Sequence, residues 1–254
     1  MKAVVAGALV ALAGAAGAQT ITINGSGSAA GNGNSGFGGV IGTGSMDIVT
    51  LADGTVNITL NRGASEHFNA TVIYIDSLAG GVTNTSVLTD TADGGRAGIS
   101  GQGFGGETSD LGFASGFGAD FAISYETAFG GLFSIGADPT NHGFVAAVGG
   151  DFGGQPGTSS ADASFLISFN MADIGLAAGD SFSMVATYLN NGNAFRSGEF
   201  IGSTATGPFP NDPNIGQAAF DLGDDDYILV NSVPAPGTAA LLGLGGLAAV
   251  RRRR

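Results

Sequence analysis

The sequence predicts an all-β protein, an antiparallel β-sandwich such as a jelly roll, with Gly-rich loops. Three observations support this. Glycine makes up 47 of 254 residues, and each glycine costs a helix interior about 1 kcal/mol. Short apolar runs with strand periodicity recur between turn residues. There is no cysteine, so a secreted chain would rely on a hydrophobic core rather than disulfides. A parallel β-helix is the alternative left open.

The expected strands differ in how they should be buried. Residues 56–60 alternate apolar and polar side chains, which predicts one buried and one wet face. Residues 72–75 form a continuous β-branched and aromatic run, typical of a central strand buried on both faces. We expect residues 164–169 and 182–188 to pair, with one or two helical turns over residues 171–178 between them. The other expected strands are residues 21–23, 121–125, 132–135, 144–148 and 227–230.

Turn and loop signals separate these strands. Residues 25–44 are rich in Gly, Asn and Ser, which is compatible with a disordered loop or with an irregular sheet edge. Residues 90–95 predict a turn that leads into a Gly-rich segment over residues 98–106. Residues 191–200 are expected to form a loop.

The N-terminus has the three parts of a secretory signal peptide, predicted over residues 1–18. Met1 and Lys2 form a short positive region, and residues 3–13 are apolar. Ala16 and Ala18 give the small-x-small pattern of a cleavage site before Gln19. A transmembrane helix is the alternative, but the run is too short for one. The body of the protein would then be residues 19–232.

The C-terminal tail, residues 233–254, also has three parts. A turn motif comes first, formed by Val233, Pro234, Ala235, Pro236 and Gly237. An apolar run over residues 239–250 follows, which predicts a short hydrophobic helix of about 18 Å against a bilayer core of about 30 Å. A cationic stop ends the chain, formed by Arg251, Arg252, Arg253 and Arg254. This length favours a transient membrane hold over a permanent anchor or a buried core helix.

That order of motif, apolar helix and arginine cluster resembles the PEP-CTERM sorting signal of Gram-negative bacteria, here with Pro-Ala-Pro in place of Pro-Glu-Pro. The resemblance covers the tail only. It implies that a membrane protease of the exosortase type cuts at the motif, after export by the secretion machinery. It also implies release to the cell surface or to the extracellular polysaccharide matrix.

Two body segments are similar to strands of DOMON-like sandwiches and family 9 carbohydrate-binding modules. The first is residues 68–77 with Gly80 and Gly81, and the second is residues 165–182. The resemblance implies a sandwich and contact with surface glycans, but no ligand residue carries over without Trp. If the body is a carbohydrate-binding module, glycan binding should vanish on mutating loop aromatics such as Phe195 or Tyr188.

The charge of the body limits its partners. All 21 acidic residues lie in residues 19–232 against only three arginines, so the formal charge there is −18. Such a surface repels nucleic acid and anionic lipid. It suits a soluble secreted protein, divalent cations, or a neutral or cationic matrix.

Catalytic signals are weak. Residues 101–106 match G-x-G-x-x-G, but a dinucleotide site needs a helix after the motif, and the following residues form helices poorly. His67 and His142 lack metal-ligand spacing. Glu66, Glu107, Glu126 and Glu199 have no pattern that separates them from surface charge. We therefore expect no enzymatic activity.

Calcium is the one cofactor that the body suggests, and the block of acidic residues is the reason. Asp221, Asp224, Asp225 and Asp226 place four carboxylates within six residues, and Asp90 and Asp93 lead into a glycine turn. Calcium takes six to eight oxygen ligands, and secreted modules bind it weakly. Solvated acidic turns are the alternative explanation.

Together these features predict a secreted, non-enzymatic surface or extracellular-matrix protein, associated with exopolysaccharide. One alternative is a carbohydrate-binding module that recognises a particular glycan. A second alternative is an unrecognised glycan hydrolase.

Overall fold

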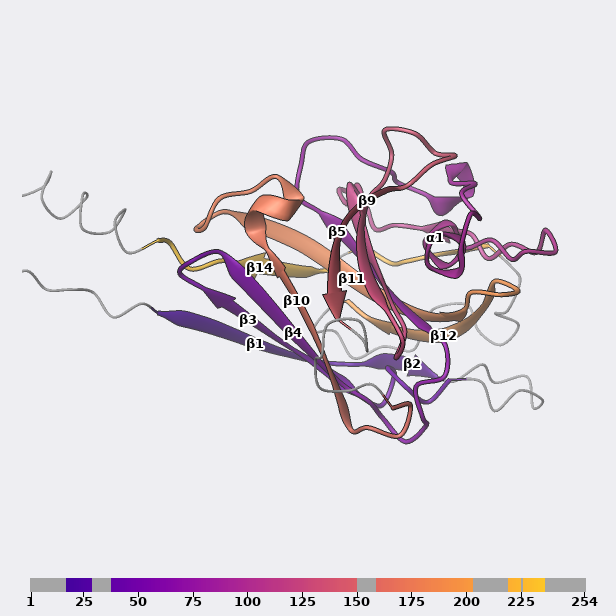
Figure 1. Cartoon of the computed structure of the whole chain (residues 1–254), viewed down its shortest axis with the longest axis horizontal. Coiled ribbons are helices and arrows are strands. Elements are labelled where there is room, and N and C mark those ends of the chain that lie inside the picture. Colours follow the sequence, from indigo (N-terminus) through magenta and orange to yellow (C-terminus); the bar gives the residue numbers. More distant parts are fainter. Residues whose placement is uncertain (1–16, 29–37, 150–158, 203–218, 225, 236–254) are drawn as a thin grey trace, which may run out of the picture.

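A computed structural model describes residues 17–28, 38–149, 159–202, 219–224 and 226–235, and it is mostly β, as predicted. Two antiparallel sheets face one another across a hydrophobic core (Figure 1). The alternation of apolar side chains along the strands creates this core, because each sheet turns its apolar side chains toward the other.

The smaller sheet has four strands in the order β1-β3-β4-β10. Along β3, β4 and β10 every second side chain is buried, so one face packs inward and the other meets solvent, as predicted for residues 56–60. Its strands are β1 (Ala18–Asn24), β3 (Ser45–Leu51), β4 (Thr55–Asn61) and β10 (Ser164–Asn170).

The larger sheet has the order β2-β12-β11-β5-β7-β8-β9, and β14 pairs with the first half of β11. Strand β5 lies near its middle and is buried on both faces, as predicted for residues 72–75. Its strands are β2 (Ser26–Ser28), β5 (Ala70–Asp76), β7 (Phe121–Tyr125), β8 (Gly130–Ser134), β9 (Gly143–Gly149), β11 (Ser181–Asn190), β12 (Phe195–Ile201) and β14 (Ile228–Asn231).

A second apolar cluster covers the outer face of the larger sheet. Val72 and Tyr74 point into it from β5, while Ile99 and Leu111 pack against them from the loops and helix above. The Tyr74 hydroxyl donates to the carbonyl of Ile99 at 2.8 Å. The short elements of this layer are η1 (Thr85–Val87), α1 (Gly94–Ser100), β6 (Leu111–Gly112) and β13 (Phe220–Asp221), the last two forming a small parallel pair.

The predicted pairing of residues 164–169 with residues 182–188 is wrong, because these strands belong to different sheets. Strand β10 pairs with β4, whereas β11 pairs with β5, β12 and β14. The turns between them are the 3₁₀ helix η3 (Met171–Ile174), as expected for this region. Gly175 and Gly179 follow with positive φ, and this change of direction carries the chain across the sandwich.

Two further expectations need correction. Residues 191–200 are not simply a loop, since β12 pairs with β2 and β11 there. Residues 90–95 were expected to form a turn, but helix α1 begins within them, at Gly94. Its Asp93 side chain accepts from the Arg96 amide as an N-cap, and Gly101 ends the helix in the left-handed conformation. These caps offset the poor helix propensity of its glycines.

The Gly-rich stretch over residues 25–44 is ordered where the structure describes it. Residues 26–28 form β2, and Val40 and Ile41 are buried. The buried carboxylate of Glu199 accepts hydrogen bonds from the amides of Gly39 and Gly42 at 2.7 and 3.0 Å. Residues 29–37 lie outside the described ranges.

Candidate functional site

The described chain enters and leaves the sandwich at one end, shown at the left of Figure 1. Strand β1 begins at Ala18, and β14 ends at Asn231. A Cβ placed on Gly17 would lie 3.7 Å from Cγ1 of Val233, an ordinary van der Waals contact. The two predicted processing points are therefore neighbours in space, although more than 200 residues separate them in sequence.

Of the predicted signal-cleavage residues, Ala18 and Gln19 are the first residues of β1, and Ala16 lies outside the described residues. Cleavage before Gln19 would remove one pair from the register with β3, Ala18 with Leu51, and leave the other pairs in place.

The beginning of the tail is held by the turn before β11. The Gly179 amide donates to Oγ of Ser232 at 2.7 Å, and the Ser232 amide donates to the carbonyl of Asp180 at 3.1 Å. Val233 and Ala235 are half-buried and Pro234 is exposed, all without regular secondary structure. Pro236, Gly237, the apolar run, and Arg251, Arg252, Arg253 and Arg254 lie outside the described residues. Within the described ranges, no helix is long and apolar enough to cross a bilayer.

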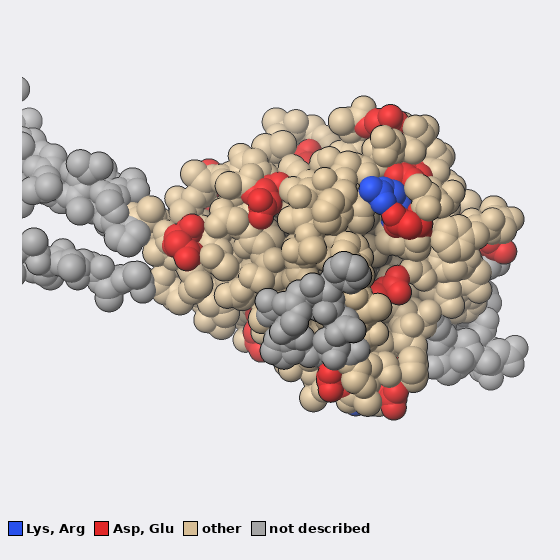
Figure 2. All heavy atoms as spheres, viewed as in Figure 1, with Lys and Arg blue, Asp and Glu red and all other residues tan. Residues whose placement is uncertain are grey.

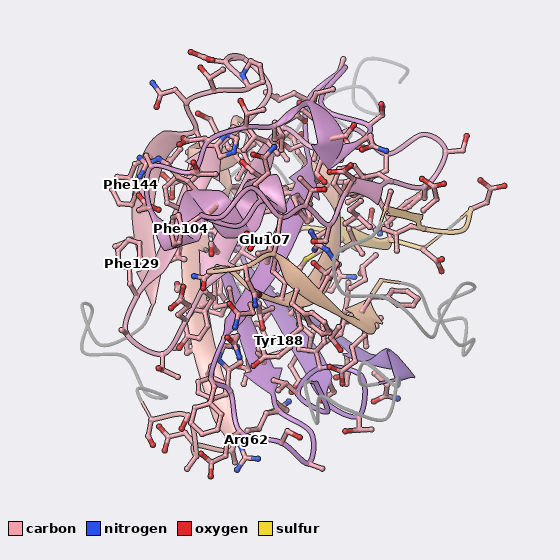
Figure 3. All side chains as sticks on the ribbon, turned by 90° about the vertical axis from the view of Figure 1, so that its right-hand side faces the viewer. Arg62, Phe104, Glu107, Phe129, Phe144 and Tyr188 are labelled. Atoms are coloured by element: carbon pink, nitrogen blue, oxygen red, sulfur yellow. The ribbon has the colours of Figure 1, made fainter. Side chains whose placement is uncertain are left out.

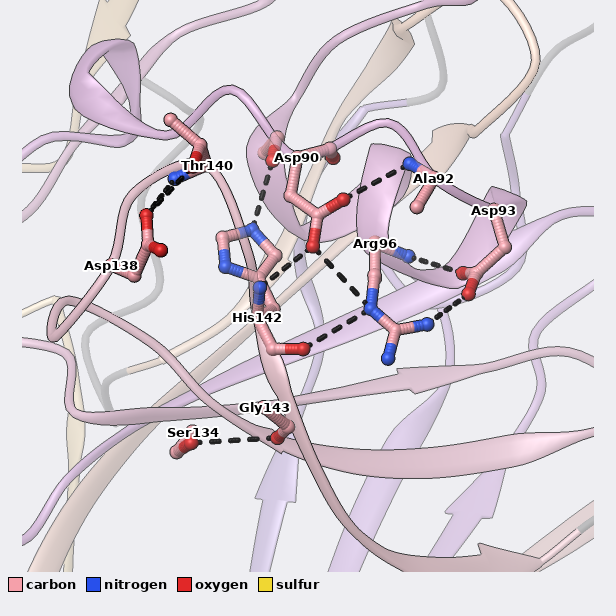
Figure 4. Close-up of polar contacts among 10 residues, drawn as sticks. Asp90, Ala92, Asp93, Arg96, Ser134, Asp138, Thr140, His142 and Gly143 are labelled. Atoms are coloured by element: carbon pink, nitrogen blue, oxygen red, sulfur yellow. Dashed lines mark hydrogen bonds and ion pairs between the residues drawn. The ribbon is translucent and has the colours of Figure 1, made fainter.

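The predicted acidic residues Asp90 and Asp93 are brought together by Arg96 (Figure 4). Asp90 is buried, and its Oδ2 lies 3.4 Å from Nε of Arg96 while accepting from the His142 amide at 2.6 Å. Asp93 pairs with Nη1 of the same guanidinium. The guanidinium thus occupies the position of counter-ion between these two carboxylates.

The other acidic segment is more open. Asp221 and Asp224 are exposed, while Asp226 is half-buried and accepts from the Gly223 amide at 2.7 Å; Asp225 lies outside the described residues. Across the part of the chain that the structure describes, no three acidic or histidine side chains are grouped to hold a metal ion. On the face shown in Figure 2, acidic side chains are scattered rather than gathered into one patch.

A serine–histidine contact lies beside Asp90, and sequence reasoning missed it. Nε2 of His142 is 2.9 Å from Oγ of Ser100, and both residues are fully buried. The Ser100 hydroxyl donates to the carbonyl of Asp90, so its proton points away from the imidazole. Burial lowers the pKa of His142, partly offset by the charge of Asp90. This contact ties the end of α1 to the segment before β9, and both side chains are enclosed by the protein.

A cleft opens between the start of α1, the end of β7 and strand β9, with a volume of about 560 Å³. Phe104 and Phe144 line it with 61% and 52% of their surfaces exposed, and Phe129 lies beside Phe144 with ring centroids 6.2 Å apart. Figure 3 shows Phe104, Phe129 and Phe144 together at one side of the molecule. Sequence reasoning missed this group because its members come from three separate segments.

Polar groups line the same cleft. Asn191, in the turn between β11 and β12, donates from Nδ2 to Oε1 of Glu126 at the end of β7. Burial raises the pKa of Glu126, and the charge of Asp93 raises it further against the lowering effect of the Asn191 hydrogen bond. Ser124 is 3% exposed, and its hydroxyl has no hydrogen-bond partner among the described residues.

The remaining residues that the sequence singled out lie away from the cleft or serve the fold. Gly101 ends α1, so residues 101–106 follow a helix instead of preceding one and lack the geometry of a dinucleotide loop. Tyr188 is buried and its hydroxyl accepts from the Asn69 amide at 3.1 Å, so it is not a loop aromatic that can present its ring to a glycan. Phe195 is only half-exposed and does not line the cleft.

Glu66 is exposed and accepts from Ser160, whereas Glu107 accepts from the Gly105 amide.

With this geometry in place, the chain was compared with known proteins. No family model, no curated protein and no solved structure matches it.

Proposed function

We propose that this chain is a secreted, non-enzymatic surface or extracellular-matrix protein, delivered by its signal peptide and by a PEP-CTERM-type tail. In this proposal an exosortase-type membrane protease cuts the tail and releases the body to the cell envelope or to the surrounding exopolysaccharide. The finer likeness of the body to DOMON-like or jelly-roll sandwiches belongs to the same proposal. The tail's three-part order carries it.

The exit geometry supports this proposal. Ser232 is the last residue tied to the sandwich by the hydrogen bonds to Gly179 and Asp180. The motif follows directly, without regular secondary structure over residues 233–235 and with Pro234 exposed. A protease can reach an exposed segment without secondary structure far more easily than a paired strand. Removal of the tail would leave β14 and its pairing with β11 unchanged.

The orientation of the body also suits a membrane hold. Helix α1, at the start of which the cleft opens, lies toward the opposite end of the molecule from the point where Ala18 and Val233 meet (Figure 1). A chain held by its tail would turn that end away from the membrane. The three arginines of the body donate to internal acceptors, so they offer the anionic headgroups little free positive charge.

Cell fractionation tests the proposal. We expect the wild-type chain in the surface or medium fraction of a host that carries the sorting protease. A variant with Arg251, Arg252, Arg253 and Arg254 all replaced by Ser should lose the stop and accumulate unprocessed. The matched control replaces Arg62 in the body, which leaves the tail intact. Equal release of the wild-type and tail-variant chains would contradict the proposal.

The cleft favours a second candidate function, carbohydrate binding, which is compatible with the first. Exposed phenylalanine rings beside hydrogen-bonding side chains suit a sugar, whose ring has apolar C–H faces and polar hydroxyl edges.

A further inference from the structure

We propose that the cleft lined by Phe104, Phe129, Phe144, Glu126, Asn191 and Ser124 binds an amino sugar, a pyranose ring that carries an ammonium group, within a polysaccharide chain. The preference for a sugar over a cationic peptide rests on the proposed function. The site itself rests on the geometry of the cleft, independently of the tail.

The aromatic rings supply the apolar part of the site. Phe104 and Phe144 keep more than half of their surfaces exposed, and both line the same cleft. Large apolar side chains that are exposed together in this way mark binding sites. Phe144 lies against Phe129 with an interplanar angle of 29° and edge-on to Phe133 at 5.6 Å. The rings are thus held in place by their neighbours and can stack on a sugar ring without further ordering.

The loop that carries Phe104 is likewise fixed. The Phe104 amide donates to the carbonyl of Gly192 at 3.1 Å, and the Gly105 amide donates to Glu107 at 3.0 Å. A Cβ on Gly94 would lie 2.7 Å from Nδ2 of Asn191, so a larger residue there would require this amide to shift away from the start of α1. A preorganised wall of this kind lowers the entropic cost of binding.

Ser124 points to a ligand that carries hydroxyl groups. Ser124 lines the cleft and is only 3% exposed, yet its hydroxyl has no hydrogen-bond partner among the described residues. A buried hydroxyl without a partner destabilises the fold because it has lost its hydrogen bonds to water, and a ligand hydroxyl would satisfy it. Neighbouring side chains on the same face of the strand, Ser124 and Glu126, would then act together.

The charges of the cleft select a cation. Asp93 and Glu126 line it, Asp90 pairs with the lining residue Arg96, and Glu107 accepts from the Gly105 amide next to Phe104. The cation that lines the cleft, Arg96, already pairs with Asp90 and Asp93 and stacks over Phe133 with 4.9 Å from Cζ to the ring centroid. Glu126 has a neutral partner, Asn191. An ammonium beside Glu126 and over the exposed rings gains both ionic and cation–π attraction, whereas a uronate or sulfate meets repulsion.

Isothermal titration of the purified full-length protein tests this site with three probes at low ionic strength. They are β-1,4-linked glucosamine oligomers, their N-acetylated forms and oligouronates. We expect glucosamine oligomers to bind at least tenfold more tightly than the N-acetylated oligomers, and oligouronates not to bind. Oligolysine of equal charge should bind more weakly than the glucosamine oligomer, because it has no hydroxyl for Ser124. Raising the salt should weaken binding.

Single-residue variants test whether the sugar binds in this cleft. Phe104→Ala and Phe144→Ala should each weaken glucosamine binding about fivefold or more, and Glu126→Gln about tenfold. Ser124→Ala should weaken it while leaving the melting temperature unchanged or higher, since the hydroxyl has no partner to lose. Phe68→Ala and Glu66→Gln are the matched controls, an exposed ring and an exposed carboxylate outside the cleft, and both should bind as wild type.

Several outcomes would overturn the proposal. Among them are no saccharide binding, equal affinity for the N-acetylated oligomer, equal affinity for oligolysine, or binding that Phe104→Ala, Phe144→Ala and Glu126→Gln all leave unchanged. Because titration uses purified protein and fractionation uses cells, the two proposals fail separately. Glucosamine binding by the purified chain, together with equal release of the wild-type and tail-variant chains from cells, would refute the sorting role alone.

Discussion

Ser232 accepts a hydrogen bond from the amide of Gly179 at 2.7 Å, and this contact holds the residue that precedes the predicted sorting motif. The Ser232 amide in turn donates to the carbonyl of Asp180 at 3.1 Å. Val233, the first residue of the predicted sorting motif, follows directly and lies beside Gly17. Pro234 also lies against Gly179, where an added Cβ would meet its Cα at 3.2 Å, so the first residues of the predicted motif pack on the turn before β11.

The buried His67 predicts a dependence of stability on pH. Its ring packs 4.8 Å from Phe165 and 5.6 Å from Tyr188, and burial lowers the pKa of His67 to about 4 from an ordinary 6.5. The unfolded chain therefore takes up this proton at a higher pH than the folded chain. The stabilisation is complete above pH 6.5 and is lost as the pH falls toward 4, by about 3 kcal/mol.

Denaturant unfolding at several pH values checks this linkage. We expect His67→Phe to show a smaller loss of unfolding free energy between pH 6.5 and 4 than wild type, because it removes the titrating group and keeps an aromatic ring. Comparing the two proteins cancels the contributions of His142, Asp76 and Glu126, whose pKa values are also shifted. Parallel curves for the two proteins would refute the assignment to His67.

Arg96 should matter for stability because Asp90 is buried beside it. Replacing Arg96 by Met leaves the Asp90 carboxylate without its ionic partner, which should cost about 2–4 kcal/mol of unfolding free energy. Adding Asp90→Asn to that variant should restore part of the loss, since the buried charge is gone and the amide oxygen still accepts from Ala92 or His142. A double variant no more stable than Arg96→Met would show that the ion pair is not the cause.

Glu199 should fix the loop over residues 38–44. Its carboxylate accepts from the amides of Gly39 and Gly42 and from the Ser197 hydroxyl at 2.8 Å. We expect Glu199→Ala to lower stability by about 2–3 kcal/mol and to speed hydrogen exchange at the Gly39 and Gly42 amides. Glu199→Gln keeps one acceptor oxygen and should lose less. Unchanged exchange at both amides in Glu199→Ala would contradict this role.

The calcium prediction now rests on Asp221, Asp224, Asp225 and Asp226, because Asp90 and Asp93 already pair with Arg96. A site with a dissociation constant near 1 mM would stabilise the fold by about 1.4 kcal/mol at 10 mM calcium. Thermal melts with calcium and with chelator measure this, and Asp221→Asn with Asp224→Asn should abolish the shift while Asp138→Asn should not. A midpoint that calcium leaves unchanged would end the hypothesis.

Local pattern predicted the strands well and their partners poorly. Residues 56–60 and 72–75 carry the periodicity of half-buried and fully buried strands, and β4 and β5 have that burial. Residues 164–169 and 182–188 also form strands, but their sheets depend on η3 and on Gly175 and Gly179, whose turn geometry periodicity does not encode.

The cleft could not be predicted from the sequence for a different reason. Phe104 and Phe129 lie in loops, and Phe144 lies in β9. Only the strand order β5-β7-β8-β9 and the position of α1 bring the three rings together. Helix α1 itself contains three glycines and was expected to be a turn; its caps and its packing against the larger sheet outweigh that local preference. Acidic residues look alike in sequence, so the burial of Asp90 and Glu199 had no signal there.

The mass of the mature protein tests the central claim most directly. The chain is expressed in a host with the sorting protease, recovered from the surface or medium, and weighed intact by mass spectrometry. The account predicts a chain that begins at Gln19 and ends within residues 233–237, without the apolar run and its arginines. A recovered protein that still carries Arg254 would contradict it.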